Sequence, residues 1–545
     1  MKQIENGKEF NFTNIRSFID HLVAEYGEKD AMIYKDKNKK VIRHSFVKLK
    51  HDIDAVSAFF IKKKLKGKHI AVIGKNSYEW LLTYFATINN VGVLVPLDRA
   101  LPQEEIANLI EIGDVDAIVY DPSYEEIIQN IIDEGGNLKK EFAISMDEIS
   151  QDKIDELYEM LPSYKSEFKD IKDKETTIII FTSGTTSVAK AAELSHFNIA
   201  SNVSALHKIE PLTSDDVGLL FLPLHHAFGS TGASFILSYG GACAFSDGLK
   251  YFQQELKQFK VSTFFCVPLI LDRMLEKVLK TARNQGKLEK LEKARKISKF
   301  FLKFGIDLRP ILFKEVRNAL GGSLKLLISG AAPINPETLE YFNDFGIYAI
   351  QGYGLTECSP VISGEEMLNR RPGSVGRPLP GVSVKINQPD EDGIGEIYVK
   401  GPNVMKGYYK NDEVNRQVFI DGWYNTGDLG YLDKDNFIYI SGRKKNVIVC
   451  KNGKNIYPEE IEILIDRIPG VLENVVSGVK KDDDYKIVAT LVYDEEYFDS
   501  EDKARSILEN AVEEVNDRLP KYKRIKEVIV RTEPFEKTTT NKIKR

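Results

Sequence analysis

Residues 71–98 read AVIGKNSYEWLLTYFATINNVGVLVPLD, and this stretch decides the fold class. A short apolar strand, a turn that contains glycine, an amphipathic helix and a second apolar strand follow one another, as in a βαβ unit. The same order recurs over residues 219–245 and 324–353. Strands that are apolar throughout and alternate with helices are typical of mostly parallel sheets covered by helices on both faces. The sequence therefore predicts an α/β fold.

The pattern changes in the last third of the chain. Short alternating strands such as GEIYVKG and NFIYISG are separated by glycine, proline and aspartate from residue 373 to residue 440, which indicates an antiparallel subdomain. A smaller unit of helices and strands follows, and the charged turn GRKKN separates the two. We predict a large N-terminal domain over residues 1–443 and a small, mobile α+β C-terminal domain over residues 444–545.

Composition excludes several classes of protein. The chain has 545 residues, of which 42% are hydrophobic, so it is long enough for more than one packed domain. Its formal charge of −6 does not favour a nucleic-acid partner. We expect neither a secretory signal nor a transmembrane segment, because no stretch approaches the roughly 20 apolar residues that span a bilayer. The four cysteines lack metal-ligand spacing and indicate buried free thiols in a reducing cytoplasm: Cys243, Cys266, Cys358 and Cys450.

Residues 276–321 are unusually basic. They contain 13 lysine or arginine residues against 5 acidic ones, interleaved with leucine, phenylalanine and isoleucine. One interpretation is a solvated helical face with an apolar stripe toward the core. The other is a peripheral contact with the inner surface of the membrane, which would suit an amphiphilic substrate.

Residues 178–190, IIIFTSGTTSVAK, suggest a phosphate site. A buried strand runs into small hydroxyl and glycine residues, and Lys190 follows. Small residues let backbone N–H groups and hydroxyls converge on a polyanion, and a lysine adds positive charge. The spacing is not that of a Walker A loop, and an ordinary turn rich in serine and threonine has the same composition.

Three further segments carry side chains suited to a nucleotide. ISGAAPINPE (328–337) and IQGYGLTE (350–357) are strand-to-turn transitions where a flat ring can approach the backbone. Glu357 offers a carboxylate oxygen suited to magnesium. In DGWYNTGDLGYLD, Asp428 can accept hydrogen bonds from a ribose diol, and Arg443 could reach the same sugar. Each segment could equally be an ordinary loop, turn or charged linker.

Taken in order, these segments resemble the motifs of the adenylate-forming superfamily, which includes acyl-CoA synthetases, adenylation domains and luciferases. FTSGTTSVAK is similar to the phosphate loop of that superfamily, YGLTE to its adenine and magnesium motif, and YNTGD to its ribose motif. GRKKN is similar to the hinge, and TTTNKIKR, at the end of the chain, to the segment with the catalytic lysine. The resemblance covers almost the whole sequence.

The resemblance implies a role for individual residues. Those that would hold the triphosphate are Thr182, Ser183, Gly184, Thr185, Thr186 and Lys190. Those that would enclose adenine are Gly330, Ala331, Ala332, Gln351, Gly352, Tyr353 and Gly354, with Tyr353 stacked on the ring. The catalytic positions would be Thr356 at the α-phosphate, Glu357 on magnesium, His226 beside the acyl group and Lys542 between the carboxylate and the α-phosphate. The ribose would contact Asp428 and Arg443, and Lys445 would be the hinge.

The resemblance also implies an activity. ATP and Mg²⁺ would serve to convert a medium- to long-chain fatty acid to acyl-AMP with release of pyrophosphate, and coenzyme A would then accept the acyl group. Alternatives are a fatty-acid or aryl-acid adenylating enzyme that loads a carrier protein, an aryl-acid ligase, and a weakly active nucleotide-binding regulator. The last is favoured by Ser187, Ala189 and Ala191, where the superfamily usually has glycine or proline. Chain length, oligomeric state and pathway are not readable from the sequence.

Overall fold

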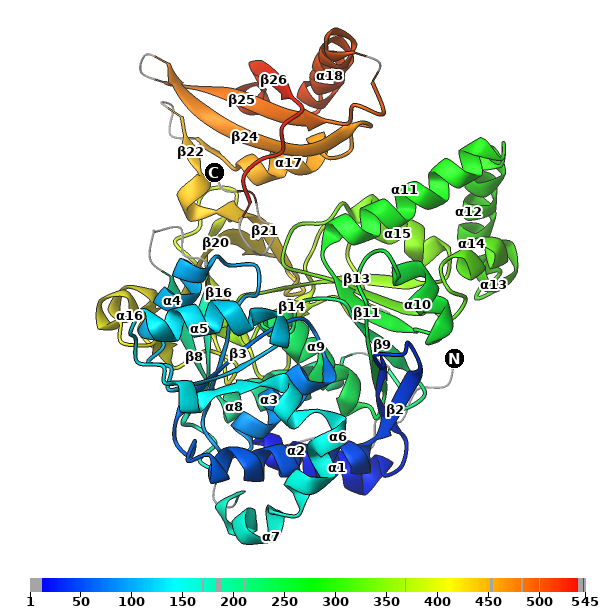
Figure 1. Cartoon of the computed structure of the whole chain (residues 1–545). Helices are drawn as coiled ribbons and strands as arrows, with labels where there is room; N and C mark the ends of the chain where they lie inside the picture. The colour runs from blue at the N-terminus through cyan, green and yellow to red at the C-terminus, as the bar shows by residue number, and fades with distance from the viewer. Residues whose placement is uncertain are drawn as a thin grey trace.

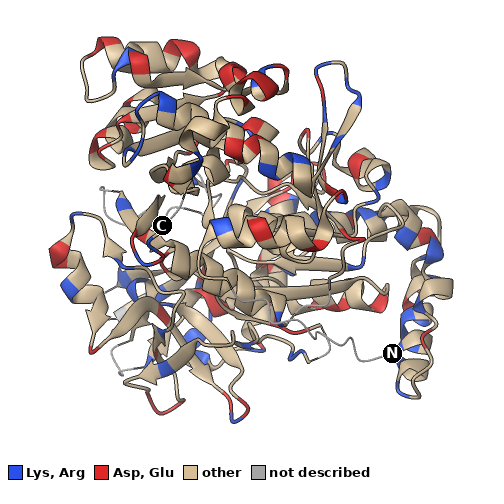
Figure 2. Ribbon diagram, turned by 90° about the horizontal axis from the view of Figure 1, so that it is seen from below, with Lys and Arg blue, Asp and Glu red and all other residues tan. Residues whose placement is uncertain are grey.

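The computed structural model describes residues 12–168, 171–182, 189–209, 212–367, 369–450, 454–481, 484–498, 500–537 and 543. Figure 1 shows a large body with helices packed on several sheets, a helical lobe (α11 to α14) on one side, and a smaller C-terminal unit above it. Figure 2 shows that charged residues lie mainly on the outer helices and loops, whereas the central strands are mostly uncharged.

The largest sheet has nine strands in the order β15-β14-β13-β12-β11-β9-β10-β1-β2. The strands from β13 to β1 run parallel, and the strands at both edges are antiparallel. The strands are β1 Asp30–Lys35, β2 Val41–Ser45, β9 Val217–Leu220, β10 Ala242–Phe245, β11 Thr263–Cys266, β12 Leu326–Ser329, β13 Tyr348–Gly354, β14 Val361–Gly364 and β15 Arg377–Pro378.

The second sheet has seven strands in the order β18-β8-β7-β4-β3-β5-β6. It is parallel from β7 to β6, while β8 and β18 are antiparallel to their neighbours. The strands are β3 His69–Ile73, β4 Val93–Pro96, β5 Ala117–Tyr120, β6 Ala143–Ser145, β7 Thr176–Thr182, β8 Lys190–Ser195 and β18 Gly407–Tyr408. The three predicted βαβ units are confirmed as β3-α3-β4, β9-α9-β10 and β12-α15-β13.

Helix α3, Tyr78–Ile88, illustrates why the local sequence folds in this way. The Ser77 side chain caps the helix by accepting a hydrogen bond from the Trp80 backbone N–H. Every residue of the helix except Glu79 is buried, since α3 lies in the main apolar cluster between the two large sheets. Burying a side chain such as Phe85, which is 1% exposed, stabilises the fold by roughly 1.5–3 kcal/mol.

The remaining helices of the body cover these sheets. Their bounds are α1 Ile15–Tyr26, α2 Phe46–Lys62, α4 Gln103–Ile112, α5 Glu125–Asp133, α6 Gln151–Tyr158, α7 Leu161–Tyr164, α8 His196–His207, α9 Ala227–Ser238, α10 Phe252–Gln258, α11 Pro268–Asn284, α12 Leu288–Leu302, α13 Arg309–Leu312, α14 Lys314–Ala319, α15 Pro336–Asp344 and α16 Asp412–Val418. The helices α11 to α14 form the lobe that connects β11 to β12 (Figure 1).

The predicted antiparallel subdomain is present as a third sheet of five strands. Its strands are β16 Ser383–Asn387, β17 Gly395–Lys400, β19 Phe419–Ile420, β20 Trp423–Leu432 and β21 Ile438–Arg443. All pairings in this sheet are antiparallel. The sequence prediction of an α/β protein with an antiparallel addition is therefore confirmed.

The C-terminal unit has an apolar core of its own, with members from Ile448 to Val530. It contains a three-stranded sheet, a two-stranded ribbon and two helices: β22 Ile448–Val449, β23 Asn455–Ile456, α17 Pro458–Ile465, β24 Val471–Lys481, β25 Asp484–Tyr493, α18 Glu501–Asn516 and β26 Glu527–Arg531. The Tyr457 hydroxyl donates to Asp390 of the body at 3.2 Å. The boundary at residues 443/444 and the mobility of this unit stay predictions.

Two smaller expectations concern helices and thiols. Among the described residues, no helix is long and apolar enough to cross a bilayer. All four cysteines are buried and form no disulfide, as predicted from their spacing.

Candidate active site

Three sheets meet around the carboxylate of Glu357, which lies in the short 3₁₀ turn Thr356–Cys358 directly after β13. The Tyr408 hydroxyl, from the second sheet, donates to Glu357 Oε1 at 2.7 Å. The Tyr424 hydroxyl, from the third sheet, lies 3.5 Å from that of Tyr408. Glu357 is only 9% exposed, so a buried hard oxygen donor stands where the three sheets converge. We call Glu357, Tyr408, Tyr424, Tyr353, Asp428 and Arg443 the three-sheet junction.

Asp428 and Arg443 lie directly opposite each other on the antiparallel strands β20 and β21. Arg443 Nε is 2.7 Å from Asp428 Oδ1, and the Tyr353 hydroxyl donates to Asp428 Oδ2 at 2.7 Å. The sequence-predicted residues Tyr353, Asp428 and Arg443 are thus in direct contact. Both carboxylate oxygens of Asp428 have a partner in this arrangement, which accounts for a buried charge at this position.

The electrostatics of the junction keep its tyrosines neutral and Arg443 charged. Burial raises the pKa of Tyr353, and the Asp428 carboxylate raises it further. Burial and the Glu357 carboxylate likewise raise the pKa of Tyr408. For Arg443, burial would lower the pKa, but the combined attraction of Asp428, Tyr353, Glu357 and Tyr424 outweighs burial and the pKa is raised. At neutral pH the tyrosines are therefore hydrogen-bond donors and Arg443 is a cation.

The strand β13 brings the predicted adenine segment to this junction. The Gln351 side chain is buried and donates to the Ser374 carbonyl at 2.8 Å, while its backbone N–H donates to Glu365 Oε2 at 3.1 Å. Burial raises the pKa of Glu365 to about 7, although Arg370 opposes the shift. Gly354 has to be glycine, because a Cβ atom there would lie 1.9 Å from the Pro360 carbonyl oxygen. At Gly352, a Cβ atom would lie 3.2 Å from the Ser363 carbonyl oxygen.

The second adenine segment follows the neighbouring strand β12. Gly330 is buried against the Phe228 ring, which a Cβ atom would approach to 2.9 Å. Ala331 and Ala332 are exposed, and Ala331 has a φ of 69°. Because β12 and β13 are adjacent and parallel, both predicted adenine segments leave the same edge of the same sheet.

The predicted phosphate segment begins and ends on two paired strands. Thr182 at the end of β7 lies opposite Lys190 at the start of β8, and the Lys190 ammonium lies 5.3 Å from the centre of the Tyr408 ring. The ring of Tyr408 thus faces Lys190 while its hydroxyl contacts Glu357. Ser183, Gly184, Thr185, Thr186 and Ser187 lie outside the described residues, as does Lys542.

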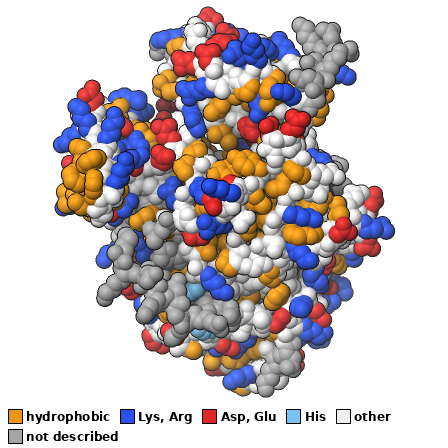
Figure 3. All heavy atoms as spheres, turned by 180° about the vertical axis from the view of Figure 1, so that it is seen from behind, with side chains coloured by type: hydrophobic (Ala, Val, Ile, Leu, Met, Phe, Trp, Pro, Cys, Tyr) orange, Lys and Arg blue, Asp and Glu red, His pale blue; other side chains and the backbone are white. Residues whose placement is uncertain are grey.

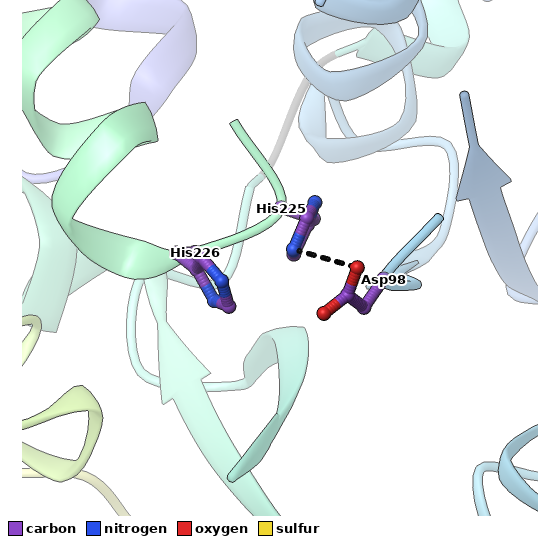
Figure 4. Close-up of side chains that lie close together, drawn as sticks. All are labelled: Asp98, His225 and His226. Atoms are coloured by element: carbon purple, nitrogen blue, oxygen red, sulfur yellow. Dashed lines mark ion pairs between the residues drawn. The ribbon is translucent and has the colours of Figure 1, made fainter. Parts of the chain in front are cut away.

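His226 and its neighbour His225 lie in the loop between β9 and α9, at the N-terminal end of the helix. Their ring centroids are 4.1 Å apart, and His225 Nε2 lies 3.4 Å from Asp98 Oδ1 (Figure 4). Asp98 follows β4 of the second sheet, so this ion pair joins the two large sheets beside His226. No motif or spacing in the sequence indicates that Asp98 and His225 are in contact.

The same three residues are a candidate metal group, since Asp98, His225 and His226 offer ligand atoms within 4.8 Å of one another. Ligand atoms about 2 Å from a tetrahedral zinc ion would be only about 3.3 Å apart. The 3.4 Å between His225 Nε2 and Asp98 Oδ1 is close to that distance, and the other separations are at most 4.8 Å. The contact between Asp98 and His225 positions the His226 loop, and we assign no metal ion to the group.

Small residues after His226 do not leave room for an alkyl chain. A Cβ atom at Gly229 would lie 2.3 Å from the Pro223 carbonyl oxygen, and one at Gly232 would lie 2.9 Å from the Phe265 ring. Ala233 is fully buried. These small residues therefore allow close packing of the helix against its neighbours.

Lys445, the predicted hinge residue, is exposed in the short turn Lys444–Asn446, between Arg443 and the core of the C-terminal unit. Just before this turn, a Cβ atom at Gly442 would lie 2.5 Å from a carboxylate oxygen of Glu459 in α17. Close approach of α17 to Gly442 therefore connects the C-terminal unit with the strand that carries Arg443.

Sequence reasoning missed Tyr408 and Tyr424. Tyr408 follows the glycine of the GYY triplet, and Tyr424 lies within the YNTGD motif, but neither was selected. Both are recognised only because their hydroxyl groups meet beside Glu357 in space.

Comparison with known proteins identifies relatives over most of the chain. The AMP-binding enzyme family matches residues 19–409, and the AMP-binding enzyme C-terminal domain matches residues 445–545. Long-chain-fatty-acid–CoA ligase 5 of Mus musculus is 32% identical over 449 residues, which are 76% of this chain and 66% of the mouse protein. Long-chain-fatty-acid–CoA ligase FadD15 of Mycobacterium bovis is 26% identical over 441 residues, 76% of this chain and 72% of that protein. The chain thus spans just under two thirds of the mouse relative's length.

Solved structures are similar over nearly the whole fold. ATP-bound MatB from Rhodopseudomonas palustris has a TM-score of 0.74 at 26% identity, with 97% of both chains covered. The o-succinylbenzoate coenzyme A synthetase of Bacillus subtilis, solved with ATP and magnesium, has a TM-score of 0.74 at 23% identity and covers 97% of this chain and 98% of that one. At that identity the second likeness concerns the fold alone. The chain belongs to the AMP-binding enzyme family, and its α/β architecture is that of adenylate-forming enzymes.

Proposed function

We propose that this chain activates a medium- to long-chain fatty acid with ATP, releases pyrophosphate and transfers the acyl group to coenzyme A. The observation that carries the proposal is the three-sheet junction, where the Glu357 carboxylate and the Asp428–Arg443 pair lie beside Tyr353. The fatty-acid class is supported by the long-chain ligases of mouse and Mycobacterium among the relatives.

The proposed reaction requires positive charge at this site. A carboxylate that attacks the α-phosphate of ATP approaches a polyanion, so opposing positive charge has to be in place in the transition state. Lys190, at one end of the phosphate segment, and Lys542, on the C-terminal tail, would supply it. Asp428 and Arg443 would fix the ribose, and Tyr353 would form one wall of the adenine site. The acyl oxygen then bonds to the α-phosphorus as the bond to pyrophosphate breaks.

Magnesium and coenzyme A are part of the same proposal. Glu357 fits magnesium because it is a buried hard-oxygen donor, and Mg²⁺ is commonly held by one or two carboxylates together with substrate phosphates. When bound, the ion would neutralise phosphate charge. Tyr408 would orient the Glu357 carboxylate through its hydrogen bond to Oε1.

The two chemical steps need different surroundings. We propose that the C-terminal unit, residues 444–545, turns about Lys445 so that Lys542 serves the adenylation step and leaves during thioester formation. Lys542→Ala should therefore abolish pyrophosphate release from ATP and the acid, yet leave thioester formation from supplied acyl-adenylate intact. Equal loss of both steps would contradict the two-arrangement mechanism.

The function is tested by pyrophosphate release from acids of graded chain length, with and without coenzyme A. We expect release with fatty acids and acyl-CoA as the product. Release with aryl acids alone would support an aryl-acid ligase, and thioester formed only on an added carrier protein would support a carrier-loading enzyme. ATP binding without release for any acid would favour a regulator.

A further inference from the structure

We propose that the outer end of the helical lobe, residues 297–312, binds the surface of an anionic lipid bilayer. We call this surface the lobe tip. The inference goes beyond the proposed function, because it concerns a surface outside the three-sheet junction and its test does not depend on ligase activity.

Helix α12 carries two apolar stripes on different faces. Leu291, Ala294 and Ser298 are spaced by three or four residues and turn inward, where Leu291 and Ala294 pack on the core of the largest sheet. A second stripe with the same helical spacing turns outward: Ile297, Phe300 and Phe301, with Phe304 just beyond the helix end. A helix that only covers a core needs one stripe, so the outward stripe is unexplained by the fold.

The outward side chains are large and well exposed. Phe300 is 57% exposed and Phe304 67% exposed, and their ring centroids are 5.2 Å apart. Across the turn, Ile306 is 47% exposed and Ile311 75% exposed. Of the large apolar residues exposed in the described part of the chain, seven lie within these sixteen positions: Ile297, Phe300, Phe301, Phe304, Ile306, Ile311 and Leu312. They form one concentrated surface instead of being scattered singly.

The lobe tip is held in place by its own buried contacts. Arg309 pairs with Asp307 at 2.8 Å and donates to the Asn343 carbonyl at 3.1 Å. Phe313, 1% exposed, anchors the end of α13 in the core. Because the backbone is fixed from inside, the exposed side chains are presented to the outside by the fold.

Lysines surround these apolar side chains. Lys293, Lys296 and Lys303 are exposed and form no ion pair with any residue that the structure describes, whereas Lys299 pairs with Glu340 and Asp344. In Figure 3 the outer end of the lobe, at the left, shows hydrophobic side chains edged by basic ones. Unpaired lysines around an apolar patch complement a bilayer with anionic headgroups, since the rings can enter the interface while the ammonium groups remain at headgroup level.

The composition favours a bilayer over a second protein. Protein–protein interfaces are depleted in lysine and enriched in arginine and in aromatic residues, phenylalanine included, so the lysines and not the phenylalanines distinguish the two occupants. Around the lobe tip, lysine is the main unpaired charge, and the apolar residues are phenylalanine, isoleucine and leucine. A second copy of this chain is therefore the less favoured occupant, and the experiment distinguishes it.

The lobe tip is also connected to the candidate site. Helix α11 starts at Pro268, immediately after β11, whose neighbour β12 leads to Gly330. The lobe is thus inserted between two strands that end at the site. Under the proposed function, a surface-bound lobe would place the enzyme where amphiphilic acids are concentrated.

The test is flotation of the full-length protein with two kinds of vesicle, one of phosphatidylcholine alone and one also containing phosphatidylglycerol. We expect binding to the anionic vesicles that weakens with salt. The triple variant F300S/F304S/I311S should bind at least about tenfold less, and K293E/K296E/K303E should lose the preference for anionic lipid. Leu249→Ser, a matched control at a position 62% exposed elsewhere on the surface, should bind as the unaltered protein does.

Three outcomes would overturn the inference. The first is the absence of flotation with either vesicle, and the second is flotation that the lobe-tip variants do not reduce. The third is sedimentation that shows a dimer of the unaltered chain that F300S/F304S/I311S converts to monomer, because the lobe tip would then bind a second copy. Unchanged melting temperatures of the variants serve as the folding control.

Discussion

The three-sheet junction and the lobe tip differ in the solvent exposure of their aromatic side chains and in whether their charged side chains have partners. At the junction, Tyr408 and Tyr424 are each 4% exposed, and their hydroxyl groups meet beside a buried carboxylate. At the lobe tip, Phe300 and Phe304 are more than half exposed. Buried polar groups are tolerated only with partners, so every contact at the junction is constrained. Exposed apolar groups contribute little to the stability of the fold. We therefore infer that the exposed side chains of the lobe tip contact something other than this chain.

The largest effect should follow from Arg443→Ala. The variant leaves Asp428, whose side chain is 6% exposed, without its cationic partner and removes the residue assigned to the ribose. We expect kcat/KM for ATP to fall by about 10²–10³-fold in the pyrophosphate-release assay. Lys444→Ala is the matched control, because this neighbouring side chain is 61% exposed and should have little effect. Similar losses in both variants would mean that the charge of the turn, and not the Asp428 pair, matters.

The second effect concerns stability and pH at Glu365. Its pKa is raised by burial from the ordinary value of 4.5 to about 7, so the folded chain binds a proton more tightly than the unfolded chain. Stability should therefore fall as the pH rises from about 5 to about 7 and stay lower above it. Glu365→Gln should remove this dependence and stabilise the protein by about 1–3 kcal/mol at pH 8.

The control for this variant is Glu391→Gln, at an exposed position in the loop between β16 and β17. Thermal unfolding of both variants at several pH values is the measurement. Equal melting temperatures of Glu365→Gln and the unaltered protein from pH 5 to 8 would show that burial beside Gln351 does not raise the pKa of Glu365.

A smaller effect is expected for Tyr408→Phe. Loss of the hydroxyl leaves Glu357 Oε1 without this donor while the ring beside Lys190 remains. One such hydrogen bond to a charged group contributes roughly 1.5 kcal/mol, so we expect about a tenfold increase in the magnesium concentration needed for half-maximal pyrophosphate release. Tyr409→Phe, whose hydroxyl contacts Asp114 at 2.6 Å outside the junction, should leave that requirement unchanged. An increase in the required magnesium concentration in both variants would contradict the role assigned to Tyr408.

Much of the fold was predictable because its determinants are local. The β3-α3-β4 unit follows from an apolar strand, the cap at Ser77 and a second apolar strand within thirty positions. The candidate site was predictable as a set of motifs, but not as contacts. Glu357 and Tyr408 are 51 positions apart, and neither the hydrophobic periodicity nor the composition of the sequence predicts that their side chains are in contact.

Two further features show where sequence reasoning ends. In a sequence, glycines such as 229 and 232 can indicate either an open space or close packing, and here the Pro223 carbonyl and the Phe265 ring show close packing. The excess of positive charge in residues 276–321 is evident from the sequence. Composition alone does not indicate which apolar stripe of a helix faces the core. The position of α12 against α11 and α15 determines that Leu291 is partly buried and Phe300 is exposed.

The smallest effect is expected at Ile311 of the lobe, and its neighbour Phe313 provides the contrast. Ile311 is 75% exposed and Phe313 is 1% exposed, although they are two positions apart. Ile311→Ser should change the free energy of unfolding by less than about 0.5 kcal/mol, as at most surface positions. Phe313→Ser should cost about 3–5 kcal/mol, because it empties a buried site in the core beside Phe345. Denaturant unfolding of the two variants measures the difference, and a similar cost for both would show that the lobe tip packs inside the molecule, where it could not also contact a lipid surface.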